Sequence, residues 1–133
     1  IEVPAEVVPD MIDEFPALFA AAACATGTTV VRGAEELRVK ESDRIAAMAT
    51  ALRALGIAVT ETPDGALIQG GRTHGGRVDS LGDHRIAMSL AVLAQRAERD
   101  VSIGDVANVA TSFPGFVELA NASGMALAVS RPD

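Results

Sequence analysis

Short stretches with helical spacing of apolar residues alternate along this chain with short stretches rich in β-branched residues. We expect helices at residues 13–25, 43–55, 83–96 and 113–122, and strands at residues 28–32, 58–62, 66–69, 77–80, 101–103 and 125–129. Gly27 and Gly56 are well placed to end the first two helices. This alternation predicts a protein of the α/β or α+β class.

The predicted helices each carry one apolar face and a candidate capping residue. The expected core positions are Phe15, Leu18, Phe19, Ala22, Ala23, Ile45, Met48, Leu52, Leu55, Ile86, Leu90, Leu93, Phe116, Leu119 and Ala120. Ser42, Asp83 and Ser112 are the expected N-caps of the last three helices. The two halves of the chain have a similar order of elements, which suggests a repeated βαβαββ unit.

Length, charge, hydropathy and cysteine content limit the kind of protein that this chain can be. A chain of 133 residues is one domain or a large piece of one. The net charge of −7 argues against a nucleic-acid surface, which needs a basic face. No apolar stretch is long enough for a membrane span. Cys24, the single cysteine, excludes an internal disulfide and is expected in the core. We therefore expect a soluble, cytoplasmic protein.

The most unusual segment is residues 37–44, Leu-Arg-Val-Lys-Glu-Ser-Asp-Arg, in which five of eight residues are charged. It lies at the start of the second predicted helix, where free N–H groups and the positive dipole end attract anions. Lys40 and Arg44 would strengthen that attraction. The same pattern also fits a solvated helix start held by salt bridges.

Two other helix starts carry unusual charges. Arg85 lies in the first turn of the third helix, where an acid is the ordinary residue, and His84 precedes it. Asp13 lies among three acids at the first helix start and could act as a general base. Each feature alone also fits an ordinary surface or capping role. Together they indicate a site that holds anionic groups and moves protons.

Other kinds of site fit the sequence poorly. Two histidines and one cysteine show no metal-ligand spacing. The sequence also lacks a nucleophile elbow and a P-loop. We expect no metal and no organic cofactor.

Four segments resemble 5-enolpyruvylshikimate-3-phosphate synthases, in the family's order and spacing. They are residues 11–16 (Met-Ile-Asp-Glu-Phe-Pro), 37–44, 83–88 (Asp-His-Arg-Ile-Ala-Met) and 111–116 (Thr-Ser-Phe-Pro-Gly-Phe). The resemblance covers nearly the entire chain. It implies transfer of the enolpyruvyl group of phosphoenolpyruvate to the 5-hydroxyl of shikimate 3-phosphate, with release of phosphate, in the pathway to aromatic amino acids.

The resemblance also implies roles for single residues. Asp13 looks like the acceptor of the 5-hydroxyl proton, and Glu41 like the residue that gives and takes the proton at the methylene carbon. Lys40 resembles a residue that contacts shikimate 3-phosphate and assists catalysis. Arg44 and Arg85 resemble the pair that holds the phosphoenolpyruvate carboxylate.

His84 lies beside that pair and is assigned to phosphoenolpyruvate binding with Glu41. Family members are longer and have two lobes, each of three βαβαββ units, with the site in the cleft between them. Residues 1–133 therefore resemble a single partial domain, about two units at the C-terminal end of one lobe. We expect the N-terminal portion of the same enzyme as partner, a monomer when intact, and no turnover by this chain alone.

Three competing interpretations remain. The related transferase that acts on a UDP-amino sugar shares fold and chemistry, although residues 40–44 and 83–85 argue against it. A noncatalytic anion-binding module would gain nothing from Asp13 and Glu41. RNA-processing enzymes of related fold are disfavoured by the acidic balance and by only four aromatic residues, all Phe.

One position departs from the pattern of many members. Thr111 stands where many of them have lysine, which suggests low sensitivity to glyphosate. A sub-micromolar inhibition constant for the intact enzyme would contradict this hypothesis.

Overall fold

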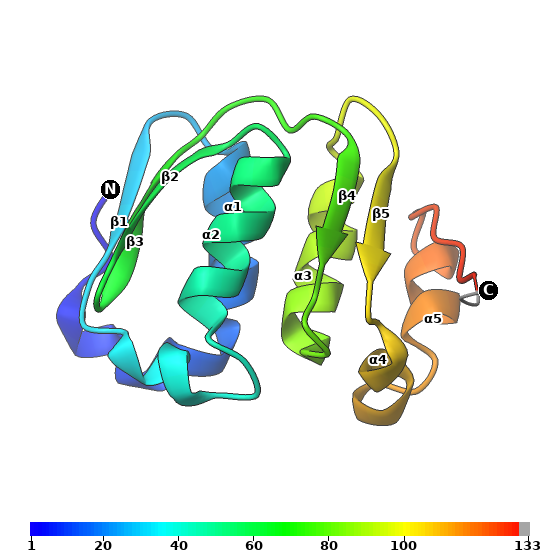
Figure 1. Ribbon diagram of the computed structural model, residues 1–133, viewed down its shortest axis with the longest axis horizontal. Coiled ribbons are helices and arrows are strands. Elements are labelled where there is room, and N and C mark those ends of the chain that lie inside the picture. The colour runs from blue at the N-terminus through cyan, green and yellow to red at the C-terminus, as the bar shows by residue number, and fades with distance from the viewer. Residues whose placement is uncertain (131–133) are drawn as a thin grey trace.

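The computed structural model describes residues 1–130 and places a layer of helices between two small sheets (Figure 1). The α-helices are α1 (Phe15–Cys24), α2 (Arg44–Ala54), α3 (His84–Ala94), α4 (Ala107–Ser112) and α5 (Phe116–Ala122). The strands are β1 (Thr28–Val31), β2 (Ala58–Thr62), β3 (Gly65–Gln69), β4 (Gly76–Asp79) and β5 (Val101–Gly104). Three 3₁₀ helices, η1 (Ala5–Val7), η2 (Pro9–Glu14) and η3 (Glu35–Val39), connect them. The predicted mixed α/β class is confirmed.

The larger sheet has the strand order β1-β3-β2 and is antiparallel throughout. Thr28 pairs with Gln69 on one side of β3, and Ala58 pairs with the same residue on the other. The chain start adds a parallel bridge between Glu2 and Val30 of β1. The smaller sheet pairs β4 with β5 in parallel.

Both halves of the chain therefore contain a helix between two parallel extended segments. In the first half α1 lies between the Glu2 bridge and β1, and in the second half α3 lies between β4 and β5. The first half then continues with α2 and the β2–β3 hairpin, which completes one βαβαββ order. The similar order seen in the sequence thus corresponds to a similar arrangement in space for the first three elements of each half. In the second half α4 and α5 follow β5, and no hairpin is formed among the described residues.

The apolar stripes predicted for the middle of the chain are confirmed. Ile45, Met48, Leu52 and Leu55 are at most 1 % exposed, and helix α2 packs on β2 and β4. The α3 positions Ile86, Leu90 and Leu93 are buried as well and belong to the same hydrophobic core. Gly56 ends α2 with φ +91°, a conformation that favours glycine, as expected for a helix stop.

The start of α2 differs from the prediction. Asp43, not Ser42, is the N-cap, and its Oδ1 accepts a hydrogen bond from the Ala46 N–H at 3.0 Å. The Ser42 hydroxyl instead donates to Asp83 of the next helix start at 2.9 Å. Two adjacent residues that can both cap a helix thus have different partners, one within the helix and one in the next helix start. The predicted cap of α3, Asp83, is confirmed.

The last third of the chain departs most from the prediction. The helix expected at residues 113–122 begins only at Phe116, as α5, because Gly115 adopts φ +82° just before it. Helix α4, at Ala107–Ser112, was not predicted. Ser112 therefore ends α4 and caps nothing, and Leu119 is exposed rather than buried. Cys24 is also exposed, at the end of α1, and not in the core.

The strand predicted at residues 125–129 does not form. The side chains of Asn121 and Gln95 accept hydrogen bonds from the Leu127 and Ala126 N–H groups, and Met125 N–H donates to the Ala120 carbonyl. Local side chains and the end of α5 thus satisfy backbone groups that a strand would need for pairing.

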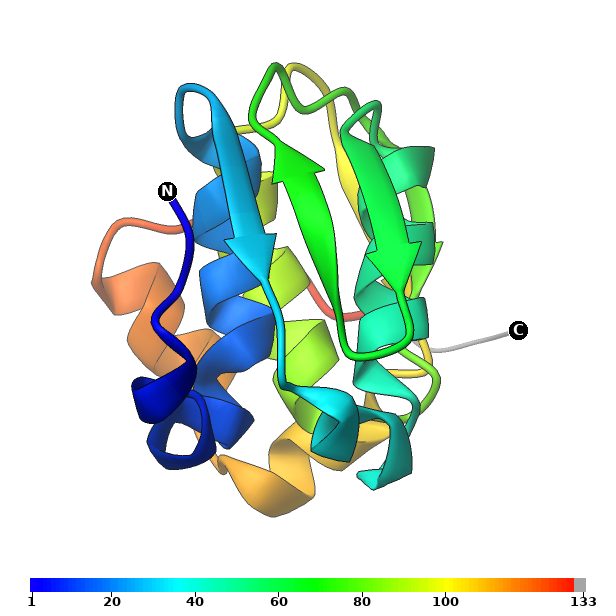
Figure 2. The ribbon, with the colours of Figure 1, turned by 90° about the vertical axis from the view of Figure 1, so that its left-hand side faces the viewer.

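Helices α1, α2 and α3 all begin at the same end of the molecule, the lower end in Figures 1 and 2. The 3₁₀ helices η2 and η3 and the short helix α4 also lie there. The three charged segments identified in the sequence are therefore brought together.

Candidate functional site

Asp83 is the fully buried carboxylate that links two of the helix starts. Its Oδ1 caps α3 by accepting the Arg85 N–H at 3.0 Å, and its Oδ2 accepts Arg44 Nε at 2.8 Å and the Ser42 hydroxyl at 2.9 Å. Burial acts to raise the pKa of Asp83, but the hydrogen bonds from Arg44 and Ser42 outweigh it and hold that pKa below its usual value. Asp83 is therefore a charged partner for Arg44.

Arg44 is the centre of the cluster. Its side chain is 1 % exposed, and Nη2 reaches Asp83 at 3.3 Å and Glu41 at 2.6 Å, while Nη1 reaches Asp13 at 3.2 Å. Burial acts to lower the pKa of Arg44, but the hydrogen bond to Asp83 and the charges of the three acids raise it. One guanidinium thus joins carboxylates from three helix starts.

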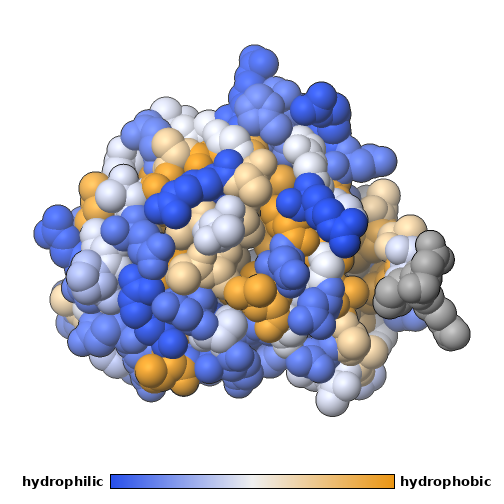
Figure 3. Space-filling view, in the orientation of Figure 1, coloured by the Kyte–Doolittle hydropathy of each residue, from blue (hydrophilic) through white to orange (hydrophobic). Residues whose placement is uncertain are grey.

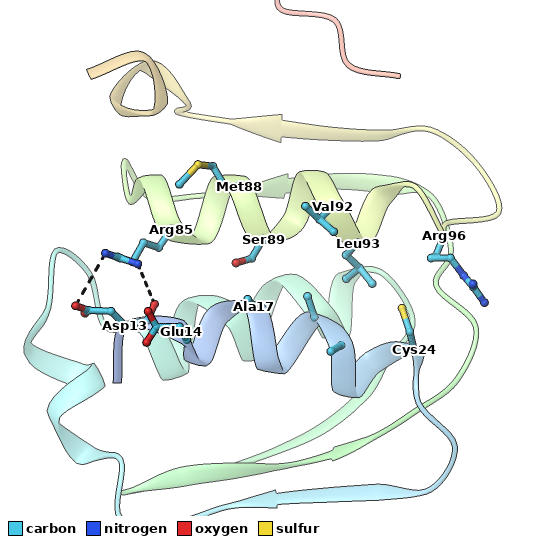
Figure 4. Close-up of a pocket in the computed structure, with 12 residues that line it drawn as sticks. Asp13, Glu14, Ala17, Cys24, Arg85, Met88, Ser89, Val92, Leu93 and Arg96 are labelled. Carbon is cyan, nitrogen blue, oxygen red and sulfur yellow. Dashed lines mark hydrogen bonds and ion pairs between the residues drawn. The ribbon is translucent and has the colours of Figure 1, made fainter. Parts of the chain in front are cut away.

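Asp13 is shared by three cations. Besides Arg44, the Lys40 Nζ lies 3.9 Å from Asp13 Oδ1, and the Arg85 Nη2 lies 4.0 Å from Oδ2. Arg85 Nη1 also donates to the Asp13 carbonyl at 3.3 Å, as the close-up in Figure 4 shows. Lys40 lies 3.7 Å from Glu36 as well. The Asp13 carboxylate is 44 % exposed, so a ligand in solvent can reach it.

The structure thus brings together five of the six residues that the sequence singled out, namely Asp13, Lys40, Glu41, Arg44 and Arg85. His84 is half-buried at the first position of α3. Among residues 1–130 no hydrogen bond or ion pair joins its side chain to the cluster. Asp83 and Ser42 were not predicted as members. Asp83 could have been found in the sequence, because it is an acid two residues before Arg85. It was interpreted only as the N-cap of the helix.

A groove of about 360 Å³ runs from this cluster between α1 and α3 (Figure 4). Asp13, Glu14 and Arg85 lie at one end, and Cys24 and Arg96 at the other. Its walls between them come mostly from small or apolar side chains. The charged groups therefore lie at the mouth of an apolar groove.

The cluster combines groups that can bind anions with groups that can transfer protons. Lys40 and Arg85 are partly exposed cations that can bind an anion, and Asp13 and Glu41 are partly exposed carboxylates that can accept or give a proton. Within the described part of the chain no group of three or more His, Cys, Asp or Glu residues could hold a metal ion. No helix among those residues is long and apolar enough to cross a bilayer.

The sequence matches the model of one protein family, EPSP synthase (3-phosphoshikimate 1-carboxyvinyltransferase), over residues 1–119. It is 63 % identical over 131 residues to the 3-phosphoshikimate 1-carboxyvinyltransferase of Xanthomonas campestris pv. campestris strain 8004, which covers 98 % of this chain and 30 % of the relative. The enzyme of the same name from Methylococcus capsulatus is 63 % identical over 130 residues, with the same coverage.

The fold agrees with solved structures of the same family. The structure of EPSP synthase from Acinetobacter baumannii superimposes with a TM-score of 0.95 and 50 % sequence identity, over 98 % of this chain and 31 % of that chain. This chain therefore spans about a third or less of the length of the proteins that it matches.

Proposed function

The chain belongs to the EPSP synthase family, and from that membership we propose that it supplies one part of a 3-phosphoshikimate 1-carboxyvinyltransferase. The complete enzyme would move the enolpyruvyl group of phosphoenolpyruvate to the 5-hydroxyl of shikimate 3-phosphate and release phosphate. One observation carries the proposal: carboxylates and cations from three distant segments meet around Arg44.

The geometry offers a role for each half of the chemistry. Asp13 would take the proton of the 5-hydroxyl of shikimate 3-phosphate. The hydroxyl oxygen would then bond to the central carbon of phosphoenolpyruvate. Glu41 would protonate the methylene carbon and later remove a proton from it as phosphate leaves. Both carboxylates contact Arg44 and are substantially exposed, at 44 % and 57 %. Each is thus held in place and accessible.

The cations would hold the charged parts of the substrates. Lys40 would contact shikimate 3-phosphate, and Arg44 and Arg85 would hold the phosphoenolpyruvate carboxylate beside His84. Arg85 is 38 % exposed and makes only long contacts with Asp13, so its donors are available to an anion. Arg44 could take part where a substrate carboxylate replaces Asp13 or Glu41 as acceptor.

The remaining portion of the enzyme would cover part of this chain. Among the described residues eight large hydrophobic side chains are exposed, including Val39 beside Lys40 and Leu81 two residues before Asp83. Figure 3 shows apolar surface between hydrophilic areas on one face. Such exposure fits a chain that spans about 30 % of its relatives. The free, exposed Cys24 fits a reducing, cytoplasmic location.

The decisive experiment measures phosphate release from phosphoenolpyruvate by the full-length parent protein, with shikimate 3-phosphate or a UDP-amino sugar as acceptor. We expect release with shikimate 3-phosphate alone. In the same protein, Glu41→Gln should lower kcat far more than it weakens substrate binding, because the amide keeps the shape but transfers no proton.

Each alternative predicts a different result. Release only with the sugar nucleotide would favour the related transferase. Binding of phosphoenolpyruvate without release would favour an anion-binding module. An equal loss of kcat and of binding in Glu41→Gln would remove Glu41 from the proton-transfer role.

A further inference from the structure

Lys40 and Glu41 lie in a loop that joins the end of η3 to the start of α2. The loop, residues 39–42, starts at Val39, the last residue of η3, and is followed by Asp43, the N-cap of α2. Leu37, 1 % exposed, anchors η3 in the core, whereas Val39 and Glu41 are exposed. The two candidate functional side chains thus sit on the segment between two anchored ends.

Arg38 joins those two ends. Its Nη1 donates to Asp43 Oδ2 at 2.8 Å, so that one ion pair closes the loop at its base. The other oxygen of Asp43 caps α2 through the Ala46 N–H. The same carboxylate therefore fixes the helix start and the loop closure.

Arg38 also ties this loop to the β2–β3 hairpin. Its Nη1 reaches Glu61 at 2.8 Å, its Nε donates to the Pro63 carbonyl at 2.8 Å, and its Nη2 donates to the Thr62 carbonyl. All three nitrogens of the guanidinium thus have acceptors. Because the guanidinium is planar and rigid, the directions of its N–H groups are fixed relative to one another. The hydrogen bonds to Glu61 and Asp43 raise the pKa of Arg38.

We propose that Arg38 is a positioning residue: it holds the loop of residues 39–42 so that Lys40 and Glu41 face Asp13 and Arg44. Within the described chain Arg38 itself makes no hydrogen bond or ion pair with these four residues. It acts only through the loop. This inference rests on the proposed function and adds to it a residue outside the charged cluster.

The distances in the cluster make the loop's position important. Glu41 lies 2.6 Å from Arg44 Nη2, and Lys40 lies 3.9 Å from Asp13. A loop that shifts by about 1 Å would break the first contact and lengthen the second. Misplacement of that size can lower the rate of an enzyme by about a hundredfold.

The test uses the full-length protein with three substitutions. Arg38→Met removes the guanidinium and keeps a side chain that can pack, and Arg38→Lys keeps the charge without the fork. The matched control is Arg53→Met, because Arg53 Nε also bonds the hairpin, at the Val59 carbonyl, 3.0 Å away. Arg53 lies in the last turn of α2, far along the helix from the loop.

Steady-state kinetics and amide hydrogen exchange are measured on each protein. We expect Arg38→Met to lower kcat by about tenfold to a hundredfold, more than it raises the KM for shikimate 3-phosphate through Lys40, and Arg38→Lys to recover part of the loss. The Ala46 amide, which donates to the Asp43 carboxylate that Arg38 holds, should exchange faster in Arg38→Met than in the unsubstituted protein. Arg53→Met should leave kcat and this amide unchanged.

Three results would overturn the inference. They are an unchanged kcat in Arg38→Met, an equal loss in Arg53→Met, or unchanged exchange of the Ala46 amide. If the unsubstituted protein shows no transfer to shikimate 3-phosphate, the proposed function fails, and a positioning role in that reaction fails with it. Exchange of the Ala46 amide would then still show whether Arg38 holds the base of the loop.

Discussion

The starts of α2 and α3 carry the same arrangement in the sequence, an aspartate cap followed by an arginine in the first turn, yet their arginines are used differently. Arg44 is 1 % exposed and its guanidinium contacts three carboxylates. Arg85 is 38 % exposed and reaches only Asp13, at 3.3 Å and 4.0 Å. The first arginine holds the site together, and the second remains open to solvent.

The difference shows how a cationic site can be built on an acidic chain. A buried arginine with a buried partner, such as Arg44 with Asp83, fixes where the surrounding carboxylates lie. An exposed arginine beside it can then bind an anion with little change in the fold. The following predictions test this division, from the largest expected effect on stability to the smallest.

The substitution Arg44→Met should give the largest loss. It leaves the buried Asp83 carboxylate without its charged partner, and the free energy of unfolding should fall by roughly 3–5 kcal/mol. Arg85→Met is the matched control and should cost less than about 1 kcal/mol, because its ion pair is long and exposed. Urea unfolding measures both, and equal losses would contradict the division.

Acid should weaken the fold through Asp83. Its pKa is lowered in the folded state, so its contribution is present above the unfolded value, roughly pH 3.9, and is lost as the pH falls through the folded value. Asp83→Asn should lower stability by about 1.5–3 kcal/mol at pH 7, because asparagine can still cap α3 but carries no charge.

The same variant provides the control for the acid effect. Urea unfolding followed from pH 7 to about pH 2 should show a shallower fall below about pH 4 for Asp83→Asn than for the unsubstituted chain. Parallel curves would mean that another carboxylate carries the acid sensitivity.

Arg85→Gln should affect binding while it barely affects stability. In the full-length protein we expect KM for phosphoenolpyruvate to rise on the order of tenfold, since a charge-assisted hydrogen bond is lost, with a change in unfolding free energy under about 1 kcal/mol. Arg85→Lys should show a smaller rise. This outcome depends on the proposed function, and an unchanged KM would show that Arg85 does not hold the substrate.

The sequence was sufficient for those features that depend on local periodicity. The stripe from Ile45 to Leu55 and the cap at Asp83 follow from helical spacing and capping chemistry, and both are present. It was not sufficient where two local solutions compete. Ser42 and Asp43 can each cap a helix, and in the structure Asp43 caps α2 while Ser42 donates a hydrogen bond to Asp83.

Other differences between prediction and structure depend on which segments pack against a residue. Leu119 lies on a predicted apolar face but is exposed, because periodicity identifies a stripe without saying what packs on it. The strand expected at residues 125–129 was replaced by bonds to Asn121 and Gln95. In the site, charge patterns indicated Arg44 and Arg85 equally, and only three-dimensional contacts separate their surroundings.

The contact between Arg44 and Asp83 also has a consequence for the order of folding. It spans 39 residues and joins the two halves of the chain, each of which contains a helix between two parallel extended segments. Such a contact forms only after both halves have docked, so we expect it to be absent from the transition state. Its loss in Asp83→Asn would then accelerate unfolding and leave the refolding rate nearly unchanged, which stopped-flow measurements in urea can establish. The ion pair would therefore contribute to kinetic stability, because it would lower the rate at which the two halves separate during unfolding.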